Sequence, residues 1–204
     1  MNDYCLVIIF AKAPVSGEVK TRLAPALGFD GAARLASVML EHTVRNAIQA
    51  GLGPVELCCA PDIRHAQFQQ AGAAGQVILA DQGDGDLGQR MVRALARGLK
   101  QFARVILVGT DAPGLDAGVL RRAAEALRKH DAVFAPAADG GYGLVVLSRA
   151  TPQLISGVAW STAQVMNQTR ERSAMLGLSV VELATLHDVD RPEDLVHVPP
   201  EWLA

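Results

Sequence analysis

The stretch CLVIIFAKAPVSGEVKTRL, Cys5–Leu23, decides the fold, because an apolar run passes directly into a charged loop. The apolar part, residues 5–10, has the length and the unbroken hydrophobicity of a strand that is buried on both faces. Strands of that kind occur in parallel sheets that are covered by helices. The loop that follows then leaves the carboxyl end of a strand, which is where open α/β sheets bind their ligands.

That loop, Lys12–Leu23, carries an excess of positive charge. Its three bases, Lys12, Lys20 and Arg22, stand against one acid, Glu18, which leaves a surplus of two. Lysine and arginine donate charge-assisted hydrogen bonds to phosphate oxygens, and Gly17 permits close approach of the backbone. The loop is not a Walker P-loop, because a valine instead of a glycine precedes Lys20. On these residues alone, a phosphate cradle and a solvated surface loop are equally open.

The rest of the chain alternates apolar runs with amphipathic stretches. We expect strands at residues 55–60, 76–80, 104–110, 131–137 and 179–184, and helices at residues 29–50, 62–72, 87–102, 116–129 and 161–177, the last capped by Ser161 or Thr162. Residues 140–148 follow a double glycine and are a candidate strand that folds back antiparallel. This order predicts an α/β protein with three layers, in which helices cover both faces of a mostly parallel, mixed sheet. No internal repeat or linker interrupts it, so we expect one domain over residues 1–204.

The composition excludes several classes of protein. With 19 basic and 21 acidic residues the net charge is −2, so the basic surplus of a nucleic-acid-binding protein is missing. No run approaches the ~20 apolar residues of a membrane span, and the N-terminal MNDYCLVIIF is not typical of a signal peptide. Cys5, Cys58 and Cys59 lie in or beside apolar runs, which predicts buried, reduced thiols and a cytoplasmic protein.

Polar residues follow the predicted strands at their carboxyl ends. They are Arg90 in DQGDGDLGQR, Asp111 in GTDAPGL, Asp139 in ADGGY, and Asp188 and Asp190 in HDVDRPEDL. Since the carboxyl ends of parallel strands meet at one edge of a sheet, we expect these side chains near the basic loop. We expect a tight turn at Asp139-Gly140-Gly141-Tyr142, with its glycines close to a substrate. Asp139 is a candidate catalytic or sugar-binding group in this turn. Trp160, in VAWST, is either a wall of the site or part of the core.

A carboxylate that faces a phosphate-binding loop repels the ligand unless a divalent cation lies between them. Mg²⁺ uses one or two carboxylates together with substrate phosphates. Asp111 is a candidate ligand because the next helix is expected to begin only near Asp116, and Asp188 or Asp190 could supply a second carboxylate. The alternative for Asp190 is that it caps a short helix over the PEDL segment.

Six blocks then occur in order: AKAPVSGEVKTRLAPALG, DLGQRM, GTDAPGL, PAADGGYGLVVL, VAWST and DVDRPEDL. Together they resemble the bacterial proteins that are grouped as a domain of unknown function with a glycosyltransferase-A fold. Some members are described as nucleotide-diphospho-sugar transferases and others as arsenosugar-biosynthesis glycosyltransferases. The resemblance runs from about residue 5 to about residue 196, and it implies the nucleotide-diphospho-sugar transferase fold.

The resemblance also implies roles for single residues. Lys12, Lys20 and Arg22 would meet nucleotide phosphates, and Asp111 would hold Mg²⁺ or Mn²⁺. Asp190 would be the second metal ligand, because the DVDRPEDL segment is similar to the DIDTPEDL-like segment at the end of related nucleotidylyltransferases. The chain departs from the family at three positions. Ser16 stands where proline is frequent, Gly114 where an acidic residue is frequent, and Gly143 where a second tyrosine is frequent. These departures concern the acceptor side, so the resemblance leaves the acceptor open.

Three functions are consistent with these residues. The first is a metal-dependent glycosyltransferase that uses a nucleoside-diphosphate sugar and an unknown small-molecule acceptor. The second is a nucleotidylyltransferase that joins a nucleoside triphosphate to a small phosphorylated substrate and releases pyrophosphate, although the first loop has only one of the glycines usual in such enzymes. The third is a nucleotide-binding module without catalysis. The sequence favours the first and leaves the base, the sugar and the oligomeric state open.

Overall fold

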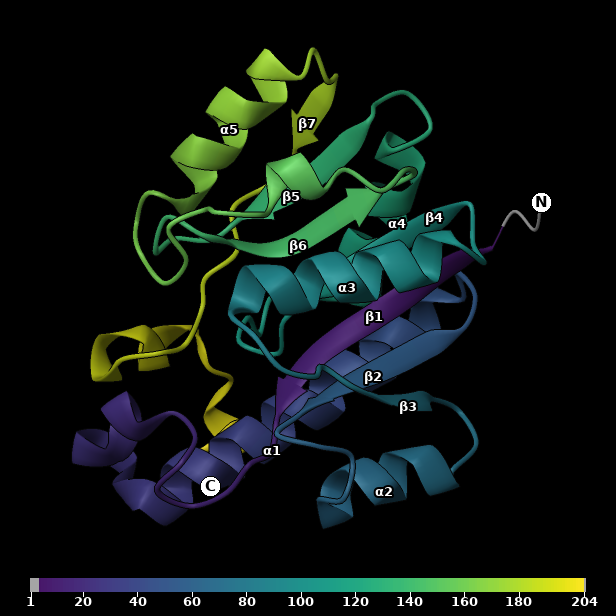
Figure 1. The fold of residues 1–204 in the computed structure, drawn as a ribbon. Coiled ribbons are helices and arrows are strands. Elements are labelled where there is room, and N and C mark those ends of the chain that lie inside the picture. The colour runs from purple at the N-terminus through teal and green to yellow at the C-terminus, as the bar shows by residue number, and fades with distance from the viewer. Residues whose placement is uncertain (1–3, 204) are drawn as a thin grey trace.

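The computed structural model describes residues 4–203 and has three layers, with helices on both faces of a seven-stranded sheet (Figure 1). The strands are β1 (Cys5–Lys12), β2 (Val55–Ala60), β3 (Ile78–Asp81), β4 (Arg104–Val108), β5 (Ala132–Pro136), β6 (Tyr142–Leu147) and β7 (Val180–Glu182). They lie in the order β3-β2-β1-β4-β6-β5-β7. All neighbouring strands are parallel except β6, which is antiparallel to β4 and β5. The expected fold class and the antiparallel strand are thus confirmed.

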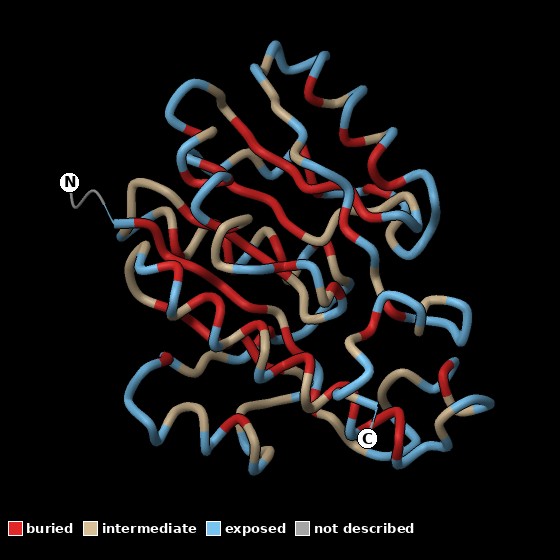
Figure 2. Tube along the Cα trace, turned by 180° about the vertical axis from the view of Figure 1, so that it is seen from behind, coloured by how far each residue is buried: buried red, intermediate tan, exposed pale blue. Residues whose placement is uncertain are grey.

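In the described part of the chain, five α-helices cover the sheet: α1 (Ala24–Ala50), α2 (Ala66–Ala73), α3 (Leu87–Leu99), α4 (Ala117–Ala126) and α5 (Val165–Met175). Alternate residues of β1 pack on opposite faces of the sheet. Val7 and Ile9 belong to the core cluster that includes α1, α2 and α4, whereas Leu6 and Ile8 belong to the cluster with α3 and α5. Figure 2 shows the consequence, with continuously buried strands in the centre and helices exposed on their outer sides.

The chain changes direction across the sheet at β1 and β4. From β1 it moves outward to β2 and β3, and it then returns to place β4 on the other side of β1, with Ile9 opposite Val108. Both strands therefore end beside each other at the same edge of the sheet. The loop after β1 and the loop after β4 leave from this point, which is the switch point where sheets of this kind bind ligands.

Short 3-10 helices complete the fold: η1 (Thr21–Leu23), η2 (Pro152–Leu154), η3 (Pro192–His197) and η4 (Pro200–Trp202). The C-terminal segment packs on the beginning of α1, where Leu23, Leu35 and Met39 form a small core with Val189 and Val198. Figure 1 shows this late segment, in yellow, beside the early purple one. The C-terminal segment and the start of α1 thus lie together near the sheet edge that carries the first loop.

Several predicted boundaries were wrong for identifiable reasons. Helix α1 begins at Ala24, five residues early, because the left-handed Gly28 (φ 69°) lets two helical pieces join across a kink. Helix α5 begins at Val165, and neither Ser161 nor Thr162 caps it. The Thr162 hydroxyl instead donates to the Ala159 carbonyl, 2.7 Å away, within a turn.

Among residues 4–203, one helical stretch, Thr21–Ala50, is long and apolar enough to cross a membrane when only length and composition are considered. Core helices of globular proteins meet the same criterion, and here Leu35, Met39, Leu40 and Ala47 are buried against the rest of the chain. This supports its assignment as a packing helix. The expectation about an N-terminal signal involves Met1, Asn2 and Asp3, which lie outside the described residues.

The cysteines confirm the expectation of buried, unpaired thiols. Cys5, Cys58 and Cys59 are free and buried within β1 and β2. Burial raises the pKa of Cys5 and of Cys59 to about 12, and it raises the pKa of Cys58 to about 11 against the opposing effect of Arg97. Because the thiolate is the reactive form, these thiols are inert in the native state.

We therefore expect slow reaction of all three thiols with a water-soluble disulfide reagent at neutral pH, and rapid reaction of the same protein in guanidinium chloride. Absorbance of the released thiolate measures both rates. A rapid stoichiometric phase in the native protein would contradict the burial of these strands.

Candidate active site

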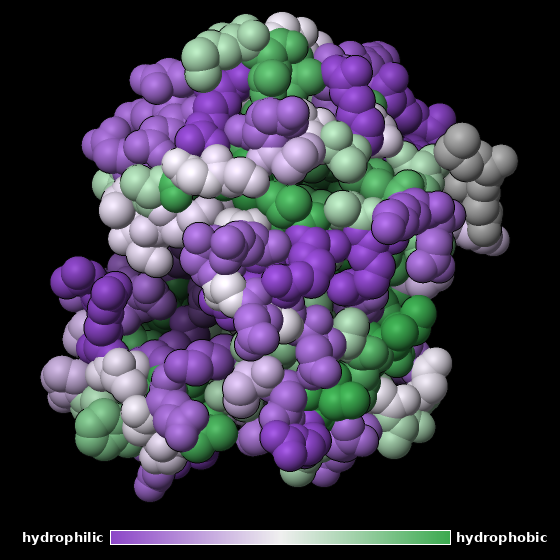
Figure 3. All heavy atoms as spheres, viewed as in Figure 1, coloured by the Kyte–Doolittle hydropathy of each residue, from purple (hydrophilic) through white to green (hydrophobic). Residues whose placement is uncertain are grey.

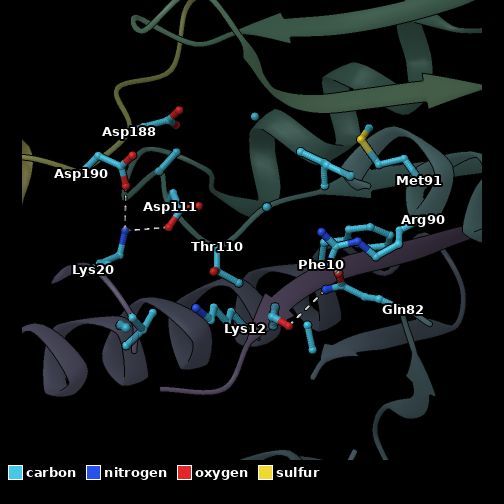
Figure 4. Close-up of a pocket in the computed structure, with 18 of the residues that line it drawn as sticks. Phe10, Lys12, Lys20, Gln82, Arg90, Met91, Thr110, Asp111, Asp188 and Asp190 are labelled. Atoms are coloured by element: carbon cyan, nitrogen blue, oxygen red, sulfur yellow. Dashed lines mark hydrogen bonds and ion pairs between the residues drawn. The ribbon is translucent and has the colours of Figure 1, made fainter. Parts of the chain in front are cut away.

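A cleft of about 710 Å³ opens at the carboxyl ends of β1 and β4. Its walls come from the first loop, the first turn of α3, the loop after β4, the start of β6 and the segment after β7. The front surface is hollowed at the lower left, beside the C-terminal segment and the segment that leads into α1, and hydrophilic residues surround the hollow (Figure 3). The cleft has a charged end with Lys20, Asp111, Asp188 and Asp190, and a second end with Phe10, Arg90 and Met91 (Figure 4).

Lys20 lies at the centre of the charged end. Its ammonium group is 2.6 Å from Asp111 Oδ1 and 2.7 Å from the Val189 carbonyl oxygen, and 3.8 Å from Asp190 Oδ1. The Lys20 side chain is only 4% exposed, whereas both carboxylates are about half exposed at 52%. The left-handed backbone of Lys20 (φ 46°) turns the loop toward β4. This places the basic loop and Asp111 together, as the β1–β4 pairing predicts.

The other basic residues of the loop are less enclosed. Lys12 is exposed and donates to the Glu18 carbonyl, 2.6 Å away, although it also lines the cleft. Arg22 is largely exposed, with Nη1 at 3.8 Å from Asp190 Oδ2. Gly17 adopts a left-handed conformation in an exposed turn and is not among the residues that line the cleft. Roles of these residues in binding phosphate stay predictions.

Asp188 and Asp190 flank the buried Val189, whose N–H donates to the Asp111 carbonyl at 2.9 Å. This backbone bond fixes the late segment to the loop after β4. The alternative that Asp190 caps the following short helix was wrong, because Asp194 accepts from the backbone N–H groups of Asp190 and Arg191. The Asp190 carboxylate is therefore left to face the cleft.

The acidic residues perturb one another. Burial raises the pKa of Asp188 to about 7, and the nearby carboxylates of Asp111, Asp139 and Asp190 add to the rise, while Lys20 opposes it. Burial and Asp111 also raise the pKa of Asp190, against the effect of Lys20 and Arg22. Near neutral pH the charged end therefore holds carboxylates that lack enough cationic partners.

At the second end, Arg90 is held by a residue that the sequence did not identify. Gln82 is buried, and its amide donates to the carbonyls of Ala11 and Cys58 at 3.2 and 3.0 Å. Its Oε1 accepts from Arg90 Nη1 at 3.0 Å. Arg90 is in the first turn of α3, which begins with a capping box formed by Asp86 and Gln89. A polar residue after a strand carries no sequence signal for this burial, which depends on tertiary contacts.

Two aromatic residues line the same end. Tyr142 begins β6 and makes edge contacts with Phe134 and Trp160, with ring centroids 5.0 and 5.8 Å apart. Trp160 lies in the turn before α5, where it lines the cleft and also packs against the core cluster of α3 and α5, so its role in a site stays a prediction. Both rings are half-buried.

The turn Asp139-Gly140-Gly141 forms as expected but does not line the cleft. The Asp139 carboxylate accepts from the Gly141 N–H at 2.8 Å. Gly140 has a φ of 91°, and an added Cβ would lie 2.4 Å from the Ala163 carbonyl oxygen. Backbone packing therefore explains these glycines, and substrate contacts of the three residues stay predictions.

The donor set at the charged end fits a hard cation. Among residues 4–203, no three His, Cys, Asp or Glu side chains are grouped closely enough to form a metal cluster on their own. Two carboxylates and the Val189 carbonyl nevertheless converge on one point, which the Lys20 ammonium occupies. Oxygen acceptors of this kind suit Mg²⁺ or Mn²⁺ when substrate phosphates supply further ligands.

Comparison with known proteins identifies relatives over nearly the whole chain. Residues 43–162 match the family model described as "Uncharacterized protein conserved in bacteria (DUF2064)". The 3-phospho-D-glycerate guanylyltransferase of Phenylobacterium zucineum (strain HLK1) is 31% identical over 183 residues, which cover 88% of this chain and 83% of that protein.

Solved structures show the same architecture. A protein of Desulfovibrio desulfuricans G20, assigned as a nucleotide-diphospho-sugar transferase, superposes with a TM-score of 0.82 at 30% identity, covering 96% of this chain and 85% of that one. A protein of Mycobacterium tuberculosis H37Rv in complex with manganese shares the fold, with a TM-score of 0.58 at 19% identity and coverage of 97% and 98%. These likenesses confirm the predicted fold and the expectation of a transferase.

The raised pKa of Asp188 predicts how stability depends on pH. An unfolded aspartate has a pKa near 3.9, so between about pH 4 and pH 7 the folded protein retains a proton that the unfolded chain has lost. The free energy of unfolding should therefore fall as pH rises through this window. In Asp188→Asn this fall in the free energy of unfolding should be smaller. The stability of the variant minus that of the wild type should therefore be larger at pH 8 than at pH 5.

Urea unfolding across this pH range in the presence of a chelator measures the effect. Glu171→Gln, at an exposed position of α5, is the matched control and should leave the pH profile unchanged. Parallel profiles for the wild type and Asp188→Asn would contradict the raised pKa of Asp188.

Proposed function

The chain belongs to the bacterial family described as DUF2064, and from this premise we propose that it is a nucleotidylyltransferase that joins a nucleoside triphosphate to a small phosphorylated substrate. The observation that carries the proposal is the guanylyltransferase relative, which matches 88% of the chain. This relative favours the second of the three functions considered from the sequence over the glycosyltransferase. By the same likeness, guanosine triphosphate and a phosphorylated hydroxy acid are the first substrates to test.

The geometry of the charged end supports transfer of a nucleotidyl group. Asp111 and Asp190, with the Val189 carbonyl, are the groups that would hold a divalent cation. When bound, such a cation neutralises charge on the triphosphate and makes the α-phosphorus more electrophilic. Lys20, Arg22 and Lys12 supply positive charges from the first loop beside these carboxylates, and in this proposal they stabilise the charge that builds up on pyrophosphate as it leaves.

The reaction balances without a further reactant. A phosphate oxygen of the second substrate attacks the α-phosphorus of the nucleoside triphosphate, and a new P–O bond forms. The bond between the α-phosphorus and the bridging oxygen breaks, and its electron pair leaves with pyrophosphate. The task of the protein is then to orient the two phosphates in line and to exclude water, rather than to supply a nucleophile.

Lys20 has two sets of partners available in this reaction. In the structure its ammonium satisfies Asp111, Val189 and Asp190, which are the acceptors that the cation would also use. Binding of a metal–nucleotide complex therefore has to release Lys20 from these acceptors, and the triphosphate offers it new oxygen partners.

A cytoplasmic location, with reduced thiols and abundant nucleotides, fits this activity.

The products separate the two catalytic functions. We expect the protein, with Mg²⁺ or Mn²⁺, to release pyrophosphate from guanosine triphosphate only when 3-phospho-D-glycerate is present, and to form one adduct that contains both substrates. Phosphorus NMR and mass spectrometry identify these products, and the other three common nucleoside triphosphates serve as comparisons. Release of a nucleoside diphosphate from a nucleotide sugar, without any reaction of the triphosphates, would instead indicate the glycosyltransferase.

Variants of the loop test the phosphate cradle. Hydrogen bonds to charged groups contribute roughly 1.5–3 kcal/mol, so Lys20→Met and Arg22→Ala should each weaken nucleotide binding by about one to two orders of magnitude. Lys20→Met should also bind Mn²⁺ more tightly than the wild type without nucleotide, because no ammonium group competes for the carboxylates. Calorimetry and the electron paramagnetic resonance of free Mn²⁺ measure the two affinities.

The control variant is Lys100→Met, which removes an exposed lysine at the far end of α3 and should change neither affinity. Thermal unfolding shows whether each variant is folded. Wild-type nucleotide affinity in both loop variants would indicate a solvated loop without a role in phosphate binding.

A further inference from the structure

Two buried hydrogen-bond donors in the cleft have no partner. The hydroxyl oxygen of Tyr142 and Nε1 of Trp160 are shielded from solvent, and neither makes a hydrogen bond within the described part of the chain. A buried polar atom without a partner costs about 1–3 kcal/mol. Both residues belong to the lining of the cleft, so a molecule bound there could supply the missing acceptor.

The protein holds both donors in fixed positions. The Tyr142 ring is packed edge-on between Phe134 and Trp160. The indole nitrogen of Trp160 lies against Gly88 in the first turn of α3, where an added Cβ would come within 2.3 Å of it. A larger residue at position 88 would displace the indole. The glycine is therefore required for this placement of the N–H group.

The surroundings determine which ligand group fits. Phe10, Leu87, Met91 and Leu107 supply apolar side chains to the same cleft and reduce the access of water. The indole N–H can only donate, and burial raises the pKa of the Tyr142 hydroxyl, which keeps its proton. The Tyr142 hydroxyl can also accept, but only an oxygen atom without hydrogens, as in a carboxylate or a carbonyl group, satisfies both the O–H and the indole N–H without bringing a further donor that needs a partner. A hydroxyl or amino group would add a hydrogen of its own.

We propose that Tyr142 and Trp160 form a subsite that binds a carboxylate or carbonyl oxygen of the second substrate. This inference rests on the proposed function, in which the phosphate of that substrate reacts at the charged end. The neighbour of Tyr142, Gly143, connects the two ends, since its Cβ position is 3.9 Å from Asp188 Oδ1. A short phosphorylated acid is therefore the class of substrate that can place its phosphate at one end and its acid group at the other.

Tyr142→Phe tests this subsite, because it removes one oxygen and keeps the ring. If the hydroxyl has no partner in the ligand-free protein, the variant should be as stable as the wild type or more stable. Its affinity for 3-phospho-D-glycerate should nevertheless fall about 10-fold or more, since the bound oxygen loses a donor in an enclosed site. Calorimetry with this compound, in the presence of a non-hydrolysable triphosphate analogue and Mg²⁺, measures the affinity.

Comparison compounds and variants make the result specific. Glycerol 3-phosphate has a hydroxymethyl group in place of the carboxylate, and its affinity should change little in Tyr142→Phe. Trp160→Phe should weaken binding of 3-phospho-D-glycerate in the same selective way. Tyr4→Phe is the matched control, because Tyr4 is the other tyrosine of the chain and is exposed at 55%. Affinity for the triphosphate analogue should be unchanged in all three variants.

Three outcomes would overturn the inference. Loss of stability in ligand-free Tyr142→Phe would show that the hydroxyl already has a partner. Equal losses of affinity for 3-phospho-D-glycerate and glycerol 3-phosphate would show that Tyr142 contacts the phosphate and not the acid group. Wild-type protein that binds neither compound would show that the subsite does not exist. Failure of the proposed function would look different, because the wild type would then release no pyrophosphate while the selective effect on 3-phospho-D-glycerate persisted.

Discussion

The ion pair between Lys20 and Asp111 is the contact on which the architecture of the cleft depends. It joins residues that are 91 positions apart, and the same ammonium reaches the Val189 carbonyl, 169 positions away. Three separate segments thus converge on one buried cation at the edge of the sheet. Without this charge, two carboxylates and a carbonyl would face one another at short range, which is unfavourable for groups that are partly removed from water. The pairing of β1 with β4 makes the contact feasible, since it brings the two loops out of the sheet side by side.

The same contact explains why the charged end suits phosphate chemistry. Burial, together with the neighbouring carboxylates, raises the pKa values of Asp188 and Asp190 even though Lys20 opposes the rise. A second cation is therefore favourable at this place, provided that Lys20 has another anion to bind. A nucleoside triphosphate with its metal ion supplies both at once. If the charged end binds a metal–nucleotide complex as we propose, binding of the metal and of the phosphates is coupled through the Lys20 side chain, and each ligand alone is expected to bind more weakly than the two together.

The sequence was sufficient for those features that follow from local pattern. The apolar run of β1 and the alternation of strands and helices predict the sheet, and the rule for strand ends places Asp111 and Asp190 at its ligand-binding edge. Features that depend on tertiary packing could not be predicted. The burial of Gln82, which positions Arg90, arises from the carbonyls of two neighbouring strands. The Val189 carbonyl and the unpartnered donors of Tyr142 and Trp160 likewise have no sequence signal, because a backbone oxygen or an aromatic ring looks the same in a core as in a site.

Differences in substrate among such transferases are expected to arise at the aromatic end rather than at the charged end. A basic loop and two carboxylates serve equally for a nucleoside triphosphate and for a nucleotide sugar, so they do not distinguish the reactions. In our proposal the aromatic wall distinguishes them, because its shape depends on small residues. Gly88 makes room for the Trp160 indole, and Gly143 leaves space next to Asp188, where a Cβ would already touch Leu186 at 3.0 Å. A tyrosine at position 143, which is frequent among the proteins that this sequence resembles, would have to displace Leu186 or extend into the cleft. One of the three positions at which the chain departs from the proteins it resembles thus lies between Tyr142 and Asp188, where the proposed second substrate would bind.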